Sequence, residues 1–190
     1  MTLPDTPLTL ILADDHAIVR MGFRLLLEGV GAHVLAEADC GEKAQQLMSE
    51  LNPDVLVMDL SMPGCGGLTA LERILARKPG QKVLIASAHA DAITAERALK
   101  AGAAGYLCKR SPPDELLKAV NQVAAGQRYI DPEIAAALRR ADRPEHPAEA
   151  LTDKEFNVFL QLAQGRSVAE VAETFHLSPN TVGTHLYHIK

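Results

Sequence analysis

Five short apolar runs alternate with five amphipathic segments over the first two thirds of the chain, and this alternation limits the possible folds. The runs are continuously apolar, which is typical of parallel strands that are buried on both faces. They lie at residues 8–13, 33–38, 55–58, 83–87 and 105–108, with helices expected at 16–29, 42–51, 68–77, 93–101 and 113–124. The pattern predicts an α/β domain with a doubly wound, flavodoxin-like parallel sheet of five strands.

The helix predicted at residues 16–29 carries large apolar side chains at helical spacing. Ile18, Gly22, Leu25 and Leu26 fall on one stripe of this helix. An amphipathic helix buries its apolar stripe against the rest of the domain. The pattern thus gives this helix a place on one face of the sheet.

A change of composition divides the chain after the α/β pattern. Residues 132–140 are predicted to form a short helix, and residues 141–150 contain Pro144, Pro147, four charges and no large apolar residue. Such a composition is typical of a linker. We therefore predict a first domain at residues 1–127, a linker with a short helix at 128–150, and an all-α domain at 151–190.

Charge and composition exclude several classes of protein. The 190 residues have a net charge of −5, which is not the basic footprint of a nucleic-acid binder. The three cysteines are scattered, which excludes a disulfide framework and a cysteine-based zinc site and fits a reducing compartment. No apolar run approaches the roughly 18 residues of a membrane span, and no basic leader precedes an apolar segment. A cytoplasmic protein without a membrane partner is expected.

Polar residues follow the predicted strands at the points where the strands end. Asp14 and Asp15 follow the first strand, Asp59 the third, Ser87 closes the fourth and Lys109 follows the fifth. Ligands of open α/β sheets bind outside these carboxyl ends. Three carboxylates at one edge repel each other unless a cation neutralises them, and hard oxygen ligands suit Mg²⁺. No glycine-rich phosphate loop follows the first strand, so metal, lysine and hydroxyl groups would have to hold a phosphate.

Each of these residues also has an ordinary structural interpretation. Asp14 or Asp15 could cap the first helix, and Asp59 could be a turn residue. Lys109 could be a surface lysine and Ser87 a hydrogen-bonded core hydroxyl. The placement of all five at the ends of the predicted strands favours a functional site.

Four runs of the sequence, at residues 14–16, 58–64, 86–88 and 100–109, resemble the receiver domain of bacterial response regulators. The resemblance covers residues 8–127 and implies that a sensor histidine kinase transfers a phosphoryl group from a phosphohistidine to Asp59. The Mg²⁺ ligands that it implies are Asp14, Asp15, Asp59 and the backbone carbonyl of Ser61. Lys109 would pair with the phosphoryl group, and Ser87 would donate its hydroxyl to it.

Tyr106, three residues before Lys109, is the second member of an implied switch. In the resembled family an aromatic residue at this position turns inward when the hydroxyl, here that of Ser87, moves toward the phosphate. The alternative is a half-buried amphipathic tyrosine beneath the fourth helix. Slow hydrolysis of the acyl phosphate would reset the switch, so a multiple-turnover enzyme is not expected.

Residues 151–190 contain the signals of a helix-turn-helix. Two capping boxes, Thr152 to Glu155 and Ser167 to Glu170, open two helices, and Ser178-Pro179 opens a third. The spacing resembles the LuxR-type DNA-binding domain and, with the receiver, the NarL/FixJ type of response regulator. The resemblance implies that the third helix is a recognition helix in the major groove. The DNA-contacting residues implied are Asn180, Thr181, Gly183, Thr184, Tyr187, His188 and Lys190.

The sequence thus predicts a two-component response regulator, in which Mg²⁺-dependent phosphorylation of Asp59 controls a DNA-binding transcription regulator. A homodimer on a pseudo-palindromic operator would follow from two-fold symmetry. The family domain continues past the third helix, so the DNA-binding domain is expected to be incomplete at Lys190.

Two alternatives remain open at this stage. The first is a receiver that acts through protein–protein contacts without DNA, because residues 151–190 hold three basic residues against four acidic ones, a net charge of −1. The second is a Mg²⁺-dependent phosphatase or transferase, for which no second acid–base carboxylate is evident beside Asp59.

Overall fold

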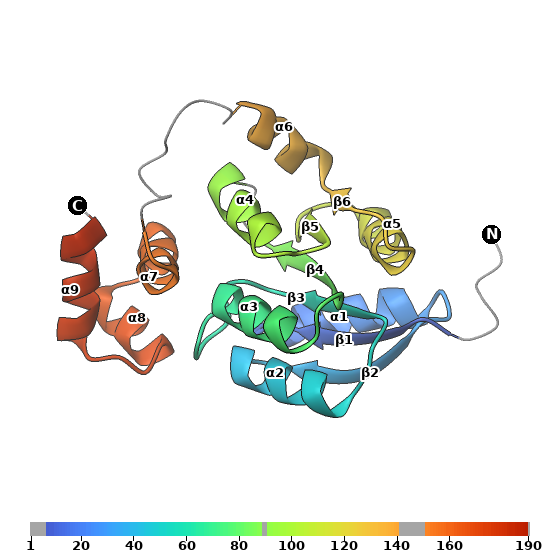
Figure 1. Ribbon diagram of the computed structural model, residues 1–190, viewed down its shortest axis with the longest axis horizontal. Helices are drawn as coiled ribbons and strands as arrows, with labels where there is room; N and C mark the ends of the chain where they lie inside the picture. Colours follow the sequence, from blue (N-terminus) through green and yellow to red (C-terminus); the bar gives the residue numbers. More distant parts are fainter. Residues whose placement is uncertain (1–6, 89–90, 141–150, 190) are drawn as a thin grey trace.

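The computed structural model describes residues 7–88, 91–140 and 151–189, which form an α/β domain and a separate group of three helices (Figure 1). The sheet has the strand order β2-β1-β3-β4-β5-β6, and every pair is parallel. The strands are β1 (Thr9–Ala13), β2 (His33–Ala38), β3 (Val55–Met58), β4 (Lys82–Ser87), β5 (Gly105–Cys108) and β6 (Tyr129–Ile130). The helices between them are α1 (Ala17–Glu28), α2 (Gly41–Glu50), α3 (Gly67–Arg77), α4 (Ala92–Lys100) and α5 (Pro113–Ala124). The predicted doubly wound sheet is confirmed.

Alternate side chains of each strand supply two apolar layers, one on each face of the sheet. From β1, Ile11 packs with residues of α2, α3 and α4, whereas Leu10 and Leu12 pack with residues of α1 and α5. This two-sided burial explains why the strands are apolar throughout. The helices cover both faces, so the polar residues after the strands are left at the carboxyl edge of the sheet.

A sixth strand was missed by the prediction of five. Tyr129 and Ile130 pair with β5, and helix α6 (Pro132–Arg140) follows at the predicted position. Buried Asp131 joins the two elements, because its carboxylate accepts hydrogen bonds from the Glu133 backbone and, over 2.5 Å, from the Ser111 hydroxyl. A two-residue strand has too little pattern to be recognised from sequence. Residues 129–140 therefore extend the receiver fold, although the sequence placed them in the linker; the remainder of that linker, 141–150, lies outside the described residues.

The apolar stripe predicted on α1 is divided between two faces of the helix. Leu26 packs on the sheet together with Phe23 and Leu27. Ile18 and Leu25 instead point to solvent, with 80% and 67% of their surface exposed, and Met21 lies beside them at 57%. The helix therefore carries two apolar faces, and the sequence pattern does not show which one the sheet covers.

The C-terminal unit is built from helices α7 (Asp153–Ala163), α8 (Val168–Thr174) and α9 (Pro179–Ile189). Both predicted capping boxes are present, at Thr152 with Glu155 and at Ser167 with Glu170. The small core of this unit consists of Val158, Val171, Ala172 and Val182, with partly buried apolar residues around it. A helix-turn-helix of α8 and α9 follows from this arrangement. Among the helices that the structure describes, none is long and apolar enough to cross a bilayer.

Candidate functional site

The strand ends bring the polar residues predicted from the sequence to one edge of the sheet. The Asp59 backbone N–H donates to the Ala13 carbonyl over 2.8 Å, which places Asp59 beside the end of β1. The Lys109 N–H donates to the Ser87 carbonyl, also over 2.8 Å. Because these strands are neighbours in the order β1-β3-β4-β5, the functional side chains converge from four strand ends.

Lys109 forms two short ion pairs in a nearly dry environment. Its Nζ lies 2.6 Å from Asp14 Oδ2 and 2.8 Å from Asp59 Oδ2. Burial lowers the pKa of the Lys109 ammonium, but the Asp59 and Asp14 carboxylates raise it further, and the net pKa lies above its ordinary value. Lys109 therefore keeps its positive charge where a phosphoryl group would bring negative charge.

Asp59 is held with one carboxylate oxygen unused. The residue is 2% exposed, and Oδ1 has no hydrogen-bond partner among the described residues. Burial raises the pKa of Asp59, and Lys109 opposes this without cancelling it. A buried, unpaired carboxylate oxygen is costly unless a ligand satisfies it, so this atom is a site for a cation or for a bond.

The residues at this edge fit a hard divalent cation. Ligand atoms of Asp14, Asp15, His16 and Asp59 all lie within 4.8 Å of one another. Three carboxylates stand against a single lysine, so the net charge of the cluster is negative. Oxygen-rich, partly open clusters of this kind suit Mg²⁺, which keeps several of its waters.

His16 and Arg20 are parts of this site that sequence reasoning missed. His16 Nδ1 lies 2.7 Å from Asp15 Oδ1, and its backbone N–H donates to Asp14 Oδ1 over 2.9 Å. Arg20, one turn into α1, donates to the Asp14 carbonyl over 2.5 Å and pairs with Glu37 of β2 at 2.9 Å. The adjacency of His16 to the two acids was visible in the sequence, whereas the contact between Arg20 and Asp14 depends on the helix geometry.

Ser61 lies two residues after Asp59, at the start of the loop between β3 and α3. The Ser61 backbone N–H lowers the pKa of Asp59, against the larger effect of burial. The Ser61 hydroxyl accepts a hydrogen bond from Gln164 of α7, with 3.4 Å between the two atoms. The loop next to Asp59 is therefore tied to the C-terminal unit.

Ser87 and Tyr106, the predicted switch pair, are in contact inside the receiver. Both side chains are fully buried, and Tyr106 hydrogen-bonds to Ser87. Burial raises the pKa of the Tyr106 hydroxyl far above its ordinary value. The tyrosine is not half-buried, as the alternative interpretation had it, because the end of β5 lies within the sheet and is covered on both faces.

The helix predicted to contact DNA presents most of the predicted residues to solvent. Asn180, Gly183, Thr184 and Tyr187 are exposed and Thr181 is partly buried, whereas Val182 faces the core. In Figure 1, α9 lies on the side of the helical unit away from the sheet. His188 belongs to α9, and Lys190 lies outside the described residues. The receiver therefore does not cover this face of α9.

A doubly wound sheet with a buried aspartate, a paired lysine and a cluster of acidic residues at its carboxyl edge defines a receiver, and the attached helix-turn-helix defines a response regulator. Comparisons with known proteins agree. Residues 10–121 match the family model "Response regulator receiver domain", and residues 149–190 match "Bacterial regulatory proteins, luxR family". The chain belongs to the two-component response regulators with a LuxR-type helix-turn-helix.

Relatives resemble both parts of the chain. The "Response regulator GacA" of Pseudomonas aeruginosa is 39% identical over 184 residues, which are 94% of this chain and 86% of that protein. A LuxR-family two-component response regulator from Aurantimonas sp. has a TM-score of 0.69 at 39% identity, covering 72% of this chain and 98% of its own. The response regulator RcsB in a DNA complex has a TM-score of 0.67 at 25% identity, covering 97% and 90%.

Proposed function

We propose that this response regulator accepts a phosphoryl group on Asp59 from a sensor histidine kinase, and that this modification controls the binding of a homodimer to a pseudo-palindromic operator in the cytoplasm. The observation that carries the proposal is the buried Asp59 carboxylate with Lys109 on one oxygen and no partner on the other. A nucleophile held in this way is typical of covalent phosphoryl transfer.

The chain's own residues have distinct roles in this transfer. An Asp59 oxygen forms a bond to phosphorus as the bond from phosphorus to the kinase histidine breaks, and the imidazole leaves. Lys109 stabilises the charge on the transferred group, and the Ser87 hydroxyl donates to one of its oxygens. Asp14, Asp15, Asp59 and the Ser61 carbonyl would hold Mg²⁺, which neutralises charge on the phosphoryl oxygens. Water later hydrolyses the acyl phosphate, so the protein resets slowly and does not act as a multiple-turnover enzyme.

The DNA-binding part of the proposal is supported by the exposed face of α9 and by the likeness to RcsB in its complex with DNA. The net charge of −1 over residues 151–190 favours a second candidate, a phosphorylation switch that acts on a protein partner instead of DNA. Selection of bound fragments from the genomic DNA of the source organism distinguishes the two. Enrichment of sequences with two related half-sites supports the first, and its absence with phosphorylated protein supports the second.

Phosphorylation is tested with the full chain, a small acyl-phosphate donor and Mg²⁺. Intact-mass measurement should show one added phosphoryl group on the wild-type protein and none on Asp59→Asn. Asp54→Asn is the matched control, because Asp54 lies outside the cluster and is hydrogen-bonded to Thr9. Equal labelling of Asp59→Asn and wild type would show that the acceptor is another residue.

A further inference from the structure

The chain leaves β5 through a short loop that carries Lys109 at its first position. We call residues 109–112, between β5 and α5, the lysine loop. The Lys109 N–H donates to the Ser87 carbonyl over 2.8 Å, so the loop is anchored where it leaves the sheet. After Lys109, the side chains of Arg110 and Pro112 are exposed and that of Ser111 is partly buried. Ser111 is therefore the residue through which the rest of the loop can be held against the receiver.

Asp131 supplies an anchor for Ser111 from the far side of β6. The residue is 3% exposed, and its Oδ2 accepts a hydrogen bond from the Ser111 hydroxyl over 2.5 Å. A longer contact, over 3.5 Å, joins the same oxygen to the Cys108 N–H. The other oxygen, Oδ1, accepts from the Glu133 N–H over 3.0 Å in the first turn of α6. One buried carboxylate thus joins the lysine loop to the start of α6, and hydrogen bonds to a carboxylate are stronger than those between neutral groups.

The position of Asp131 is itself fixed by the elements around it. Its N–H donates to the Tyr106 carbonyl of β5 over 2.9 Å, and its carbonyl accepts from the Ala135 N–H of α6 over 2.8 Å. Two residues earlier, the buried Tyr129 donates its hydroxyl to the Glu115 carboxylate of α5. The Asp131 carboxylate therefore stands on a rigid support, which an anchor for a loop requires.

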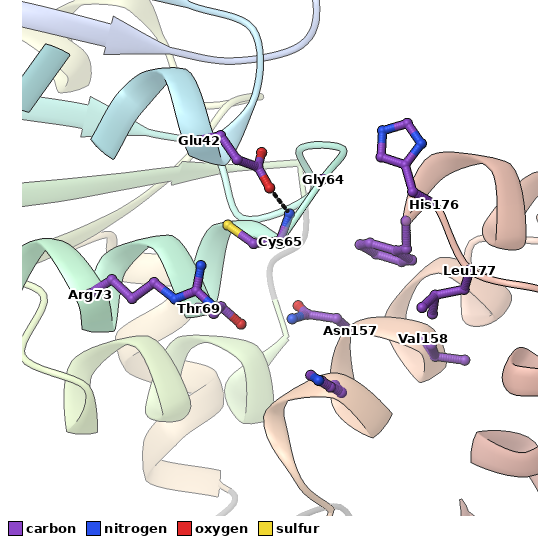
Figure 2. A pocket seen from close by; sticks show the side chains of 11 residues that line it. Glu42, Gly64, Cys65, Thr69, Arg73, Asn157, Val158, His176 and Leu177 are labelled. Atoms are coloured by element: carbon purple, nitrogen blue, oxygen red, sulfur yellow. Dashed lines mark hydrogen bonds between the residues drawn. The ribbon is translucent and has the colours of Figure 1, made fainter. Parts of the chain in front are cut away.

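The loop that follows Asp59 has a comparable anchor on the other side of the site. The Glu42 carboxylate, in the first turn of α2, accepts a hydrogen bond from the Cys65 N–H over 2.7 Å, drawn as a dashed line in Figure 2. Glu42 is exposed, whereas Asp131 is buried, and a hydrogen bond is stronger away from water. Of these two loops, the one that carries Lys109 therefore has the stronger carboxylate anchor.

We propose that Asp131 is a positioning residue for Lys109, because it holds the Ser111 hydroxyl and with it the loop from which the lysine reaches the phosphoryl group. The inference rests on the proposed function of Asp59 and Lys109. Lysine has a flexible four-carbon side chain, so the place of its ammonium depends on where the loop holds the backbone. A misplacement of about 1 Å can slow a reaction about a hundredfold. Asp131 does not contact the reacting atoms and acts through Ser111.

The test measures the rate at which a small acyl phosphate with Mg²⁺ phosphorylates the full chain. Asp131→Ser keeps a hydroxyl that caps α6, but its side chain is too short to hold Ser111 as well. We expect phosphorylation about tenfold slower, within the range that misplacement of a catalytic group causes. Asp54→Ser is the matched control, because Asp54 also accepts from a hydroxyl, that of Thr9 over 2.7 Å, at the opposite edge of the sheet. Its rate should equal that of wild type.

Two variants of Ser111 show whether the effect passes through this hydrogen bond. Ser111→Ala should slow phosphorylation as much as Asp131→Ser does, whereas Ser111→Thr retains the hydroxyl and should keep the wild-type rate. The double variant Asp131→Ser with Ser111→Ala should be no slower than either single variant, because each one already removes the same bond. Additive effects of the two substitutions would overturn the proposal, and so would a wild-type rate for Asp131→Ser.

Binding of Mg²⁺, measured by calorimetry, separates positioning from loss of structure. The acidic cluster of Asp14, Asp15 and Asp59 does not include Asp131, so Asp131→Ser should bind Mg²⁺ no more weakly than wild type. Slower phosphorylation together with weaker Mg²⁺ binding would show general damage to the site and would also overturn the proposal. Failure of the wild type itself to be labelled would refute the proposed function instead.

Discussion

Lys109 Nζ lies 2.8 Å from Asp59 Oδ2, while the second carboxylate oxygen of Asp59 has no hydrogen-bond partner among the described residues. The same ammonium lies 2.6 Å from Asp14. One buried cation therefore faces two carboxylates, with Asp15 nearby. Without a metal ion, the folded protein holds an excess of negative charge at this edge of the sheet.

Removal of the Asp59 charge should stabilise the metal-free protein. We expect Asp59→Asn to raise the free energy of unfolding by about 1 kcal/mol at neutral pH, because Lys109 keeps Asp14 as a partner. Since burial raises the folded-state pKa of Asp59, this residue destabilises the fold increasingly as pH rises through that pKa. The gain should thus vanish below the ordinary aspartate pKa. Urea unfolding at several pH values measures the difference in unfolding free energy between Asp59→Asn and wild type. A variant less stable than wild type at neutral pH would contradict the prediction.

Removal of the Lys109 charge should have the opposite effect. Lys109→Met leaves Asp14, Asp15 and Asp59 without their cation, and we expect a loss of about 3 kcal/mol in unfolding free energy. Added Mg²⁺ should restore part of that loss by supplying positive charge. Lys118→Met, at an exposed ion pair with Glu115, is the control and should change stability by less than about 1 kcal/mol. Equal effects of the two variants would argue against a functional role for the Lys109 pair.

The ion pairs of Glu37 with Arg24 and Arg20 should make a pH-dependent contribution to the free energy of unfolding. Although burial raises the pKa of Glu37, hydrogen bonds from Arg24 and Arg20 lower it more, and the net pKa lies below 4.5. The contribution is present above that value and is lost as pH falls through the lower folded-state pKa. Glu37→Gln should lower the free energy of unfolding by about 0.5–1 kcal/mol at pH 7, and should leave it unchanged at a pH below the folded-state pKa of Glu37. Thermal unfolding against pH checks this, and a constant difference would refute it.

The hydrogen bond between Tyr106 and Ser87 should couple the two residues energetically. We expect a double-mutant cycle of Tyr106→Phe and Ser87→Ala to give a coupling free energy of about 0.5–1.5 kcal/mol in the unphosphorylated protein. With Asp59 phosphorylated, the coupling should fall, because the Ser87 hydroxyl then donates to the phosphoryl group. Urea unfolding with and without an acyl-phosphate donor measures both values. An unchanged coupling would show that Ser87 keeps Tyr106 as its partner.

Gly183 offers an open position on α9 at which DNA affinity can be raised. A Cβ at this exposed glycine would meet nothing within 4 Å. Gly183→Lys adds a positive charge and removes the roughly 1 kcal/mol helix penalty of glycine. We expect tighter DNA binding, and we expect the slope of the logarithm of the binding constant against the logarithm of the salt concentration to steepen by about 1. Titrations at several salt concentrations check this, with Gln127→Lys at an exposed position of the receiver as the control. Equal slopes for the two variants would place α9 away from the phosphates.

The sequence predicts the parts of this molecule that depend on local patterns. The positions of Asp14, Asp59 and Lys109 follow from the ends of short, continuously apolar runs, because parallel topology brings such ends to one edge of the sheet. Both capping boxes are equally local and were predicted correctly. To form a capping box, Thr152 and Ser167 each require only a glutamate three residues later in the sequence.

Features that depend on packing between distant segments could not be predicted. The exposed face of α1 is as apolar as its buried face, so periodicity alone does not place Ile18 outside. Arg20 reaches the Asp14 carbonyl only because α1 returns over the end of β1. Asn157, Gln161 and Gln164 of α7 have the spacing of an ordinary solvent-facing polar surface, yet Gln161 is fully buried in the folded chain.

The exposed face of α9 has a consequence for the kind of signal that this protein transmits. A receiver that leaves the recognition helix α9 exposed does not regulate DNA binding by covering and uncovering that helix. In the proposed homodimer, two such helices must be about 34–36 Å apart to enter successive major grooves on one side of the duplex. Phosphorylation would then set the distance between the two α9 helices of the dimer, and it would do so through α7, which packs against both α9 and α3 of the receiver.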